Sequence, residues 1–192
     1  MRRAVPALAV ECGNFPLPVS STFAMNALLT SRRAGFAAIF AICAGLIGFG
    51  LWLQQARGLE PCPMCVMQRV AFVAAGLVAL IGALHGPGGW ARRIYSLLIL
   101  LAAGGGASVA VRQSWLQHNP PKVAECGADL GFMLDSFPLT DALPMIFRGA
   151  GDCSKVQWTF AGMSIPEWAL VWFVVIGAIA AIQLFAGSPS RR

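Results

Sequence analysis

Charged side chains are scarce in this chain of 192 residues: only 11% are Asp, Glu, Lys or Arg, whereas 57% are hydrophobic. Soluble domains carry about 25% charged residues, so the deficit argues against a soluble protein. The formal net charge of +6 is compatible with a nucleic-acid partner, but the arginines occur as pairs beside long apolar runs. Membrane topology explains such pairs better, and we therefore expect no nucleic-acid binding.

Four apolar segments approach the length that crosses a bilayer, which is about 20 residues for a helix. They lie at residues 34–53, 66–84, 94–111 and 168–187. The third contains three consecutive glycines at 104–106, which membrane helices tolerate because small residues let backbones approach closely. The sequence therefore predicts an all-α membrane protein, a four-helix transmembrane bundle with two large loops on one side.

The arginine pairs at 32–33, 92–93 and 191–192 predict the orientation of this bundle, because excess Lys and Arg mark the cytoplasmic side. The loops at about 54–65 and 112–166 fall on the opposite side. Seven of the eight acidic residues lie in these loops or at the start of the fourth segment: Glu60, Glu125, Asp129, Asp135, Asp141, Asp152 and Glu167. We expect both termini to be cytoplasmic and both loops to face outward.

Residues 1–25 do not fit a signal peptide, because their apolar core is only seven residues long and is followed by Glu11, glycine and prolines. We expect a disordered extension or a start assigned too far upstream, since Met25 opens a natural lead into the first span. The membrane domain then covers residues 26–187, and residues 188–192 form a cytoplasmic tail.

Four of the six cysteines map to the outward loops, namely Cys62, Cys65, Cys126 and Cys153. An even number of thiols on an oxidising side predicts disulfides, and a Cys126–Cys153 bond would stabilise the fold by about 3–4 kcal/mol in the chain-entropy model. Cys12 falls on the reducing side, and Cys43 lies within the first apolar segment. The histidines offer no zinc spacing, and Val66 stands where haem c attachment needs histidine. Copper remains an alternative, because Met64 and Met67 are soft ligands beside the Cys62–Cys65 pair.

Arg69 lies four residues after Cys65, so the two share a helix face one turn apart. A cation there, near a helix N-terminus, favours a Cys65 thiolate or a bound anion. Arginine inside a membrane helix is expensive and indicates function, although it can also anchor a span at the interface. No metal or flavin motif is visible to accept electrons from the dithiol. A membrane quinone fits this role, with Arg69 hydrogen-bonded to a quinone carbonyl.

Two stretches, "PCPMCVMQR" at 61–69 and "GDCSKVQWTFAGMSIPEWAL" at 151–170, resemble the DsbB family of bacterial inner-membrane thiol oxidases. Cys126 and the four apolar segments extend the resemblance to residues 26–187. It implies that Cys126 forms a mixed disulfide with a reduced, periplasmic DsbA-like protein. Electrons then pass through Cys126/Cys153 and Cys62/Cys65 to ubiquinone, or to menaquinone, with Cys65 and Arg69 at the quinone.

The sequence departs from the family at two positions. Gln113 stands where some members carry a histidine near the quinone, and Gln68 stands where an acidic residue is often found. His118 lies five residues beyond Gln113. We assign no role to Gln113 or to His118.

The leading hypothesis is therefore a protein-dithiol:quinone oxidoreductase of the bacterial inner membrane. One alternative is a copper-handling membrane protein that uses the cysteines and methionines at 62–67. The other is a structural membrane protein whose disulfides only hold its loops.

Overall fold

The computed structural model describes residues 31–58, 61–120, 151–154, 156 and 158–185. Its long helices are α2 (Arg32–Arg57), α3 (Pro63–His85), α4 (Gly89–His118) and α7 (Ile165–Phe185). A short 3-10 helix, η1 (Gly151–Ser154), and an antiparallel hairpin of β1 (Thr159–Phe160) and β2 (Met163–Ser164) precede α7. All four long helices are long and apolar enough to cross a membrane. The predicted all-α membrane fold with four spanning helices is confirmed.

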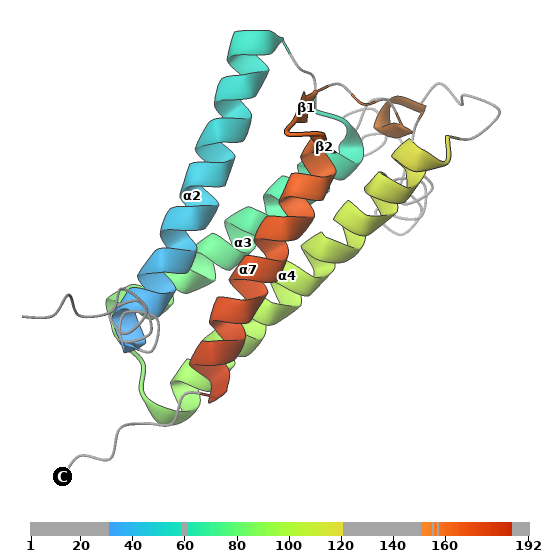
Figure 1. The fold of residues 1–192 in the computed structure, drawn as a ribbon. Coiled ribbons are helices and arrows are strands. Elements are labelled where there is room, and N and C mark those ends of the chain that lie inside the picture. The colour runs from blue at the N-terminus through green and yellow to red at the C-terminus, as the bar shows by residue number, and fades with distance from the viewer. Residues whose placement is uncertain (1–30, 59–60, 121–150, 155, 157, 186–192) are drawn as a thin grey trace, which may run out of the picture.

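Successive long helices run in alternating directions (Figure 1). α4 packs mainly on α7, and α3 lies between α2 and α4 with extensive contacts to both. α2 touches α7 sparsely, and its C-terminal end diverges from the other helices (Figure 1). We call the end of the bundle where α3 begins and α4 ends the cysteine end. The opposite end, which holds Arg33, Arg92 and Arg93, is the arginine end.

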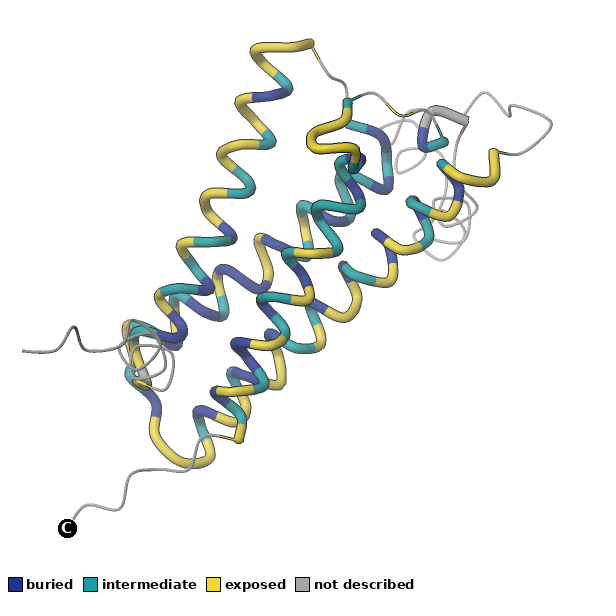
Figure 2. Tube along the Cα trace, viewed as in Figure 1, coloured by how far each residue is buried: buried dark blue, intermediate teal, exposed yellow. Residues whose placement is uncertain are grey.

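The core is built from apolar side chains that the four helices turn toward one another, with buried residues along their inward faces (Figure 2). Its centre contains the stacked rings of Phe72 and Phe173, whose centroids are 4.0 Å apart. Gly106 is required beside them, because a Cβ at this position would overlap the Phe173 ring. The glycine in α4 thus permits the close approach of α4 and α7 that the sequence predicts for small residues.

The outward faces of the helices are also apolar, as the exposed side chains of Leu77, Leu101 and Val174 illustrate. A soluble protein rarely exposes so continuous an apolar surface. These faces suit contact with lipid chains. In a bilayer the backbone must form its hydrogen bonds within the protein, and a helix forms them within its own segment.

The helices extend beyond the apolar runs from which they were predicted. α4 continues to His118 rather than stopping near residue 111, and ends where the Asn119 backbone N–H and Nδ2 both donate to the Trp115 carbonyl. α2 likewise reaches Arg57, and α3 already begins at Pro63, so the expected loops at 54–65 and 112–166 are partly helical. Hydropathy marks the thickness of the apolar layer, whereas backbone hydrogen bonding continues into polar residues. The expected extension at 1–25, the tail at 188–192, Cys12 and Cys126 lie outside the described residues.

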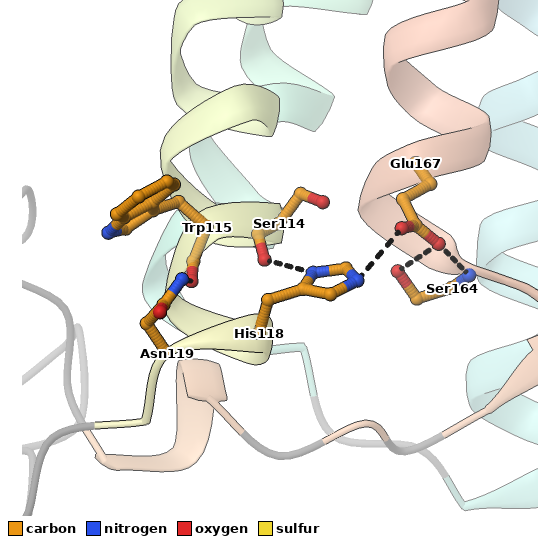
Figure 3. A network of polar contacts seen from close by, with 6 residues as sticks. All are labelled: Ser114, Trp115, His118, Asn119, Ser164 and Glu167. Carbon is orange, nitrogen blue, oxygen red and sulfur yellow. Dashed lines mark hydrogen bonds and ion pairs between the residues drawn. The ribbon is translucent and has the colours of Figure 1, made fainter.

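A polar network joins α4 to α7 at the cysteine end (Figure 3). The Ser164 backbone N–H and hydroxyl donate to Glu167 Oε2 at 2.6 and 3.0 Å. The Glu167 carboxylate thereby accepts two hydrogen bonds from Ser164 at the start of α7, one of which, from the Ser164 backbone N–H, is the Glu half of a capping box. Glu167 Oε1 also lies 3.8 Å from Nε2 of His118, whose Nδ1 is 2.9 Å from the Ser114 carbonyl oxygen. The network fixes the position of the hairpin and of α7 relative to α4.

Candidate active site

Cys62 and Cys65 lie at the beginning of α3. Cys62 is the N-cap residue with an extended backbone, and Pro63 occupies the first helical position, where its missing N–H costs nothing. The Val66 N–H donates to the Cys62 carbonyl at 3.1 Å and closes the first turn. The two sulfur atoms are 3.1 Å apart, as unbonded thiols. Both lie beside the first N–H groups of the helix, which lack intrahelical partners.

Cys153, from η1, is completely buried against Cys62. Met64, Val109 and Leu116 complete this small apolar cluster at the cysteine end. A hydrogen bond with Cys153, a second one with Cys65 and burial together raise the pKa of the Cys62 thiol well above its usual range. The structure therefore brings together three of the four predicted active cysteines, whereas Cys126 lies outside the described residues.

Cys65 differs from its partner because it faces a cavity of about 740 Å³. The cavity lies between α2 and α7, and Trp158 and Phe160 of the hairpin segment contribute to its wall. Most of the wall is apolar, and Cys65, Gln68 and Arg69 stand together on its α3 side. The largest apolar side chains of the lining are Phe49, Trp52, Phe72, Trp158, Phe160, Trp168 and Trp172. Volume and lining match those of small-molecule sites, which are mostly aromatic with few polar groups.

Arg69 extends from α3 to α2 at the wall of this cavity. Its Nη1 donates to Gln54 Oε1 at 2.9 Å, and its Nη2 donates to the Gly50 carbonyl at 3.3 Å. These bonds account for two of the five N–H donors of a guanidinium. The side chain is partly buried and lies along the cavity wall. It is therefore held where its further donors can meet a polar group inside the cavity.

Gln68 and Gln113 are site residues to which the sequence reading gave no role. Both are buried, and Gln113 Nε2 lies 3.3 Å from the Cys62 sulfur and 3.2 Å from the Cys65 sulfur. Gln68 Nε2 donates to Gln113 Oε1 at 2.8 Å. The available signal was an amide one turn after Cys65, next to Arg69, in a largely apolar helix. Nothing in the sequence connected it with Gln113 on α4.

The copper alternative needs soft ligands gathered around one point. Met64 is buried within the apolar cluster, and Met67 packs against its edge. Within the described part of the chain, no group of three or more His, Cys, Asp or Glu side chains is arranged to hold a metal ion.

Comparison with known proteins agrees with this arrangement of thiols. The sequence model of the family described as "Disulfide bond formation protein DsbB" matches residues 32–183. The chain belongs to the DsbB family. The match includes Cys62, Cys65, Arg69, Cys126 and Cys153 within its span.

Three curated relatives, each named "Disulfide bond formation protein B", illustrate the similarity. The one from Aromatoleum aromaticum is 59% identical over 162 residues, 84% of this chain and 97% of the relative. The one from Azoarcus sp. (strain BH72) is 55% identical over 161 residues, with 84% and 97% covered. The one from Acidovorax sp. (strain JS42) is 45% identical over 163 residues, with 85% and 93% covered. Each DsbB relative is thus matched over nearly its whole length.

Membership in the DsbB family confirms the predicted enzyme class, a multi-pass membrane oxidoreductase that acts as a thiol oxidase in disulfide formation. The alternative of a membrane protein with only a structural role is thereby set aside.

Proposed function

We propose that this DsbB-family protein reoxidises a periplasmic DsbA-like dithiol protein and delivers the electrons to a membrane quinone. Ubiquinone, or menaquinone, is the acceptor, and the electrons pass through Cys126/Cys153 and then Cys62/Cys65. One observation carries the proposal: Cys62 contacts Cys153 on one side and Cys65 on the other, and Cys65 opens onto the cavity that holds Arg69.

The first half of the relay moves electrons from the partner to the loop cysteines. A thiolate of the partner attacks Cys126 of the Cys126–Cys153 disulfide, forms a mixed disulfide and releases Cys153 as a thiolate. Cys153 attacks Cys62 of the Cys62–Cys65 disulfide and releases Cys65 as a thiolate. The contact between Cys153 and Cys62 supports this order, because exchange requires the attacking sulfur to reach its target directly.

The second half restores the loop pair. The partner's second thiol resolves the mixed disulfide, so that the partner leaves oxidised and Cys126 is freed as a thiol. Cys126 then attacks Cys153, which regenerates the Cys126–Cys153 disulfide and frees Cys62. Two electrons and two protons have then moved from the partner to the Cys62/Cys65 pair.

The cavity beside Cys65 suits a quinone. Its volume of about 740 Å³ falls in the range of small-molecule sites, and its aromatic and aliphatic wall suits a ring with an apolar tail. A bound quinone supplies an acceptor for two electrons and two protons. Cys65 contributes the sulfur that faces this acceptor, and Arg69 contributes charged N–H donors for a carbonyl oxygen.

The orientation proposed with this function places the cysteine end in the periplasm and both termini in the cytoplasm of a bacterium. Arg33, Arg92 and Arg93 at the arginine end support it through the positive-inside rule. Reporter fusions test it: a fusion at residue 89 should be cytoplasmic, and one at residue 125 should be periplasmic. The reverse pattern would contradict both the topology and the relay.

The decisive experiment is quinone reduction by the purified protein with a reduced DsbA-like partner. Wild type should turn over, and Cys65→Ser should abolish turnover. Cys43→Ser is the matched control, because Cys43 is buried against Gly76 in the middle of the bundle and belongs to neither pair. Stoichiometric Cu(I) binding without quinone reduction by wild type would contradict the proposal and favour the metal-handling alternative.

A further inference from the structure

The buried amides of Gln68 and Gln113 form a bridge between α3 and α4 that ends on the two sulfur atoms. Only 4% of Gln68 and 3% of Gln113 is exposed. Removing an amide from water is unfavourable unless its hydrogen bonds are replaced. The bridge supplies these bonds, through a 2.8 Å contact between the amides and two contacts from Gln113 Nε2 to sulfur.

The direction of the hydrogen bonds decides which group of Gln113 faces the cysteines. An amide carries two N–H donors on one side and an acceptor oxygen on the other, and the two sides have nearly the same shape. Gln68 Nε2 donates to the Gln113 oxygen, so the Gln113 nitrogen is the group directed between the sulfurs. The Cys65 sulfur also lies 3.8 Å from the Gln113 oxygen, a longer contact that a neutral S–H can make.

An N–H donor favours a thiolate over a thiol, because hydrogen bonds to a charged acceptor are roughly twice as strong as neutral ones. Gln113 provides this donor without a formal charge of its own. A buried cation would need an opposite charge to offset the loss of its hydration, whereas a neutral amide needs only hydrogen bonds, which the second amide supplies. The bridge therefore has the chemistry to stabilise the anion that forms on Cys65 when the Cys62–Cys65 disulfide is opened.

We propose that Gln113 stabilises the reduced, anionic form of the Cys62/Cys65 pair through its amide N–H groups, and that Gln68 is a positioning residue that fixes the orientation of Gln113. The pair thereby becomes a stronger oxidant of the loop cysteines. The inference rests on the proposed function in assigning Cys65 as the sulfur that delivers electrons.

The test is the equilibrium of the purified full chain with glutathione, with neither quinone nor partner present. In this reaction the Cys62–Cys65 disulfide and two glutathione thiols give the dithiol and glutathione disulfide. Differential alkylation and mass spectrometry of the peptide that holds both cysteines measure the reduced fraction. This equilibrium reports the stability of the reduced pair directly, and a purely structural role of the amides would not change it.

Gln113→Glu keeps the size of the side chain but replaces the N–H donors with oxygen. We expect the equilibrium constant for reduction to fall at least tenfold, which equals about 30 mV for a two-electron couple. Gln113→Leu removes the donors without adding a charge and should lower the constant in the same direction, by about three- to tenfold. Reduced Cys65 in both variants should also react more slowly with iodoacetamide at pH 7, because the thiolate is the nucleophile.

Gln68→Glu tests the positioning role with Gln113 intact. A carboxylate at residue 68 accepts but does not donate, so Gln113 should turn its nitrogen toward residue 68 and its oxygen toward the sulfurs. The equilibrium constant should fall as in Gln113→Glu. Gln183→Glu is the matched control, because Gln183 is a fully buried amide that hydrogen-bonds to Ser31 at the arginine end. This control should leave the constant unchanged even where it lowers the melting temperature.

The outcomes separate the possibilities. A shift in Gln113→Glu but not in Gln113→Leu would show that only the added charge matters, and would refute the donor role. An unchanged constant in Gln68→Glu would refute the positioning role. If wild type reduces no quinone while the Gln113 variants shift the equilibrium, the proposed function fails and the role of the amides stands. If wild type reduces quinone and the Gln113 variants leave the equilibrium constant unchanged, the proposed function stands and the role of the amides is refuted.

Discussion

Replacing Arg69 with glutamine should weaken quinone use and leave thiol exchange with the partner largely intact. Arg69 donates to Gln54 and to the Gly50 carbonyl of α2 at 2.9 and 3.3 Å, and these contacts hold the guanidinium along the cavity wall. None of the hydrogen bonds that the structure describes for Arg69 goes to Cys153 or Cys62. The substitution therefore removes a cavity donor while the relay of cysteines keeps its geometry.

The expected magnitude follows from the kind of bond that is lost. A hydrogen bond from a charged donor contributes about 1.5–3 kcal/mol, and each 1.4 kcal/mol is a factor of ten. We therefore expect the apparent KM for quinone to rise about 10- to 100-fold in Arg69→Gln. Arg69→Lys keeps the charge but loses the planar fork, so its KM should lie between those of wild type and Arg69→Gln.

A matched variant tests whether the position of the Arg69 guanidinium matters, in addition to its presence. Gln54→Leu removes the shorter of its two tethers and leaves the guanidinium in place. We expect a smaller rise in KM, about threefold, since a net contribution of about 0.6 kcal/mol is at the low end for a hydrogen bond. A melting curve for each variant tests whether the link between α2 and α3 is also lost.

The assay follows quinone absorbance at several quinone concentrations with a reduced partner in excess. A second measurement, without quinone, follows disulfide exchange between the oxidised protein and the partner. Arg69→Gln should be impaired mainly in the first measurement, with exchange largely intact. A wild-type KM in this variant would refute the role at the quinone and restore the interpretation of Arg69 as an interfacial anchor. Impairment of exchange alone would place Arg69 in the thiol relay instead.

Two further predictions concern the bundle itself. Gly106→Ala should lower the stability by about 1–3 kcal/mol, because the added Cβ would overlap the Phe173 ring. Gly104→Ala is the control and should not destabilise the fold, because a Cβ at residue 104 meets open space. Thermal unfolding in detergent compares the two variants, and equal melting temperatures would contradict the packing of Phe173 against Gly106. Glu167→Ala removes the carboxylate that accepts from the Ser164 N–H and hydroxyl at the start of α7, and should lower the stability by about 1 kcal/mol. His118→Ala should have a smaller effect, because the His118 side chain is largely exposed. An equal loss in both variants would show that the ion pair, and not the bonds to Ser164, is the stabilising contact.

The fold was predictable from the sequence because the membrane imposes a simple rule. A backbone that crosses lipid must satisfy its own hydrogen bonds, so each apolar run of sufficient length becomes a helix. The start of α3 was only partly predictable, because the apolar run places it near residue 66, whereas the helix begins at Pro63 after the N-cap residue Cys62. Helix ends were less predictable, as the extension of α4 through Gln113 shows.

The contacts across the site were not predictable in this way. Gln68 and Gln113 are 45 residues apart in sequence, and their contact depends on how α3 and α4 are rotated and shifted against each other. The position of Cys153 against Cys62 depends on how η1 packs on α4. Spacing along the chain carries no information about such rotations.

The different surroundings of Cys62 and Cys65 give the proposed relay its direction. Cys62 precedes the helix, is buried and contacts Cys153, whereas Cys65 lies in the first turn and faces the cavity. When a thiolate attacks a disulfide, the sulfur that is not attacked leaves, and it leaves faster when its anion is stabilised. Attack by Cys153 on Cys62 therefore releases the anion on Cys65, beside the Gln113 amide. Attack on Cys65 from the cavity would instead release a thiolate into the buried cluster, where hydrogen bonds and burial raise the pKa of Cys62 and oppose its ionisation. In the proposed relay, the loop cysteine therefore attacks Cys62, and Cys65 becomes the anion on the cavity side.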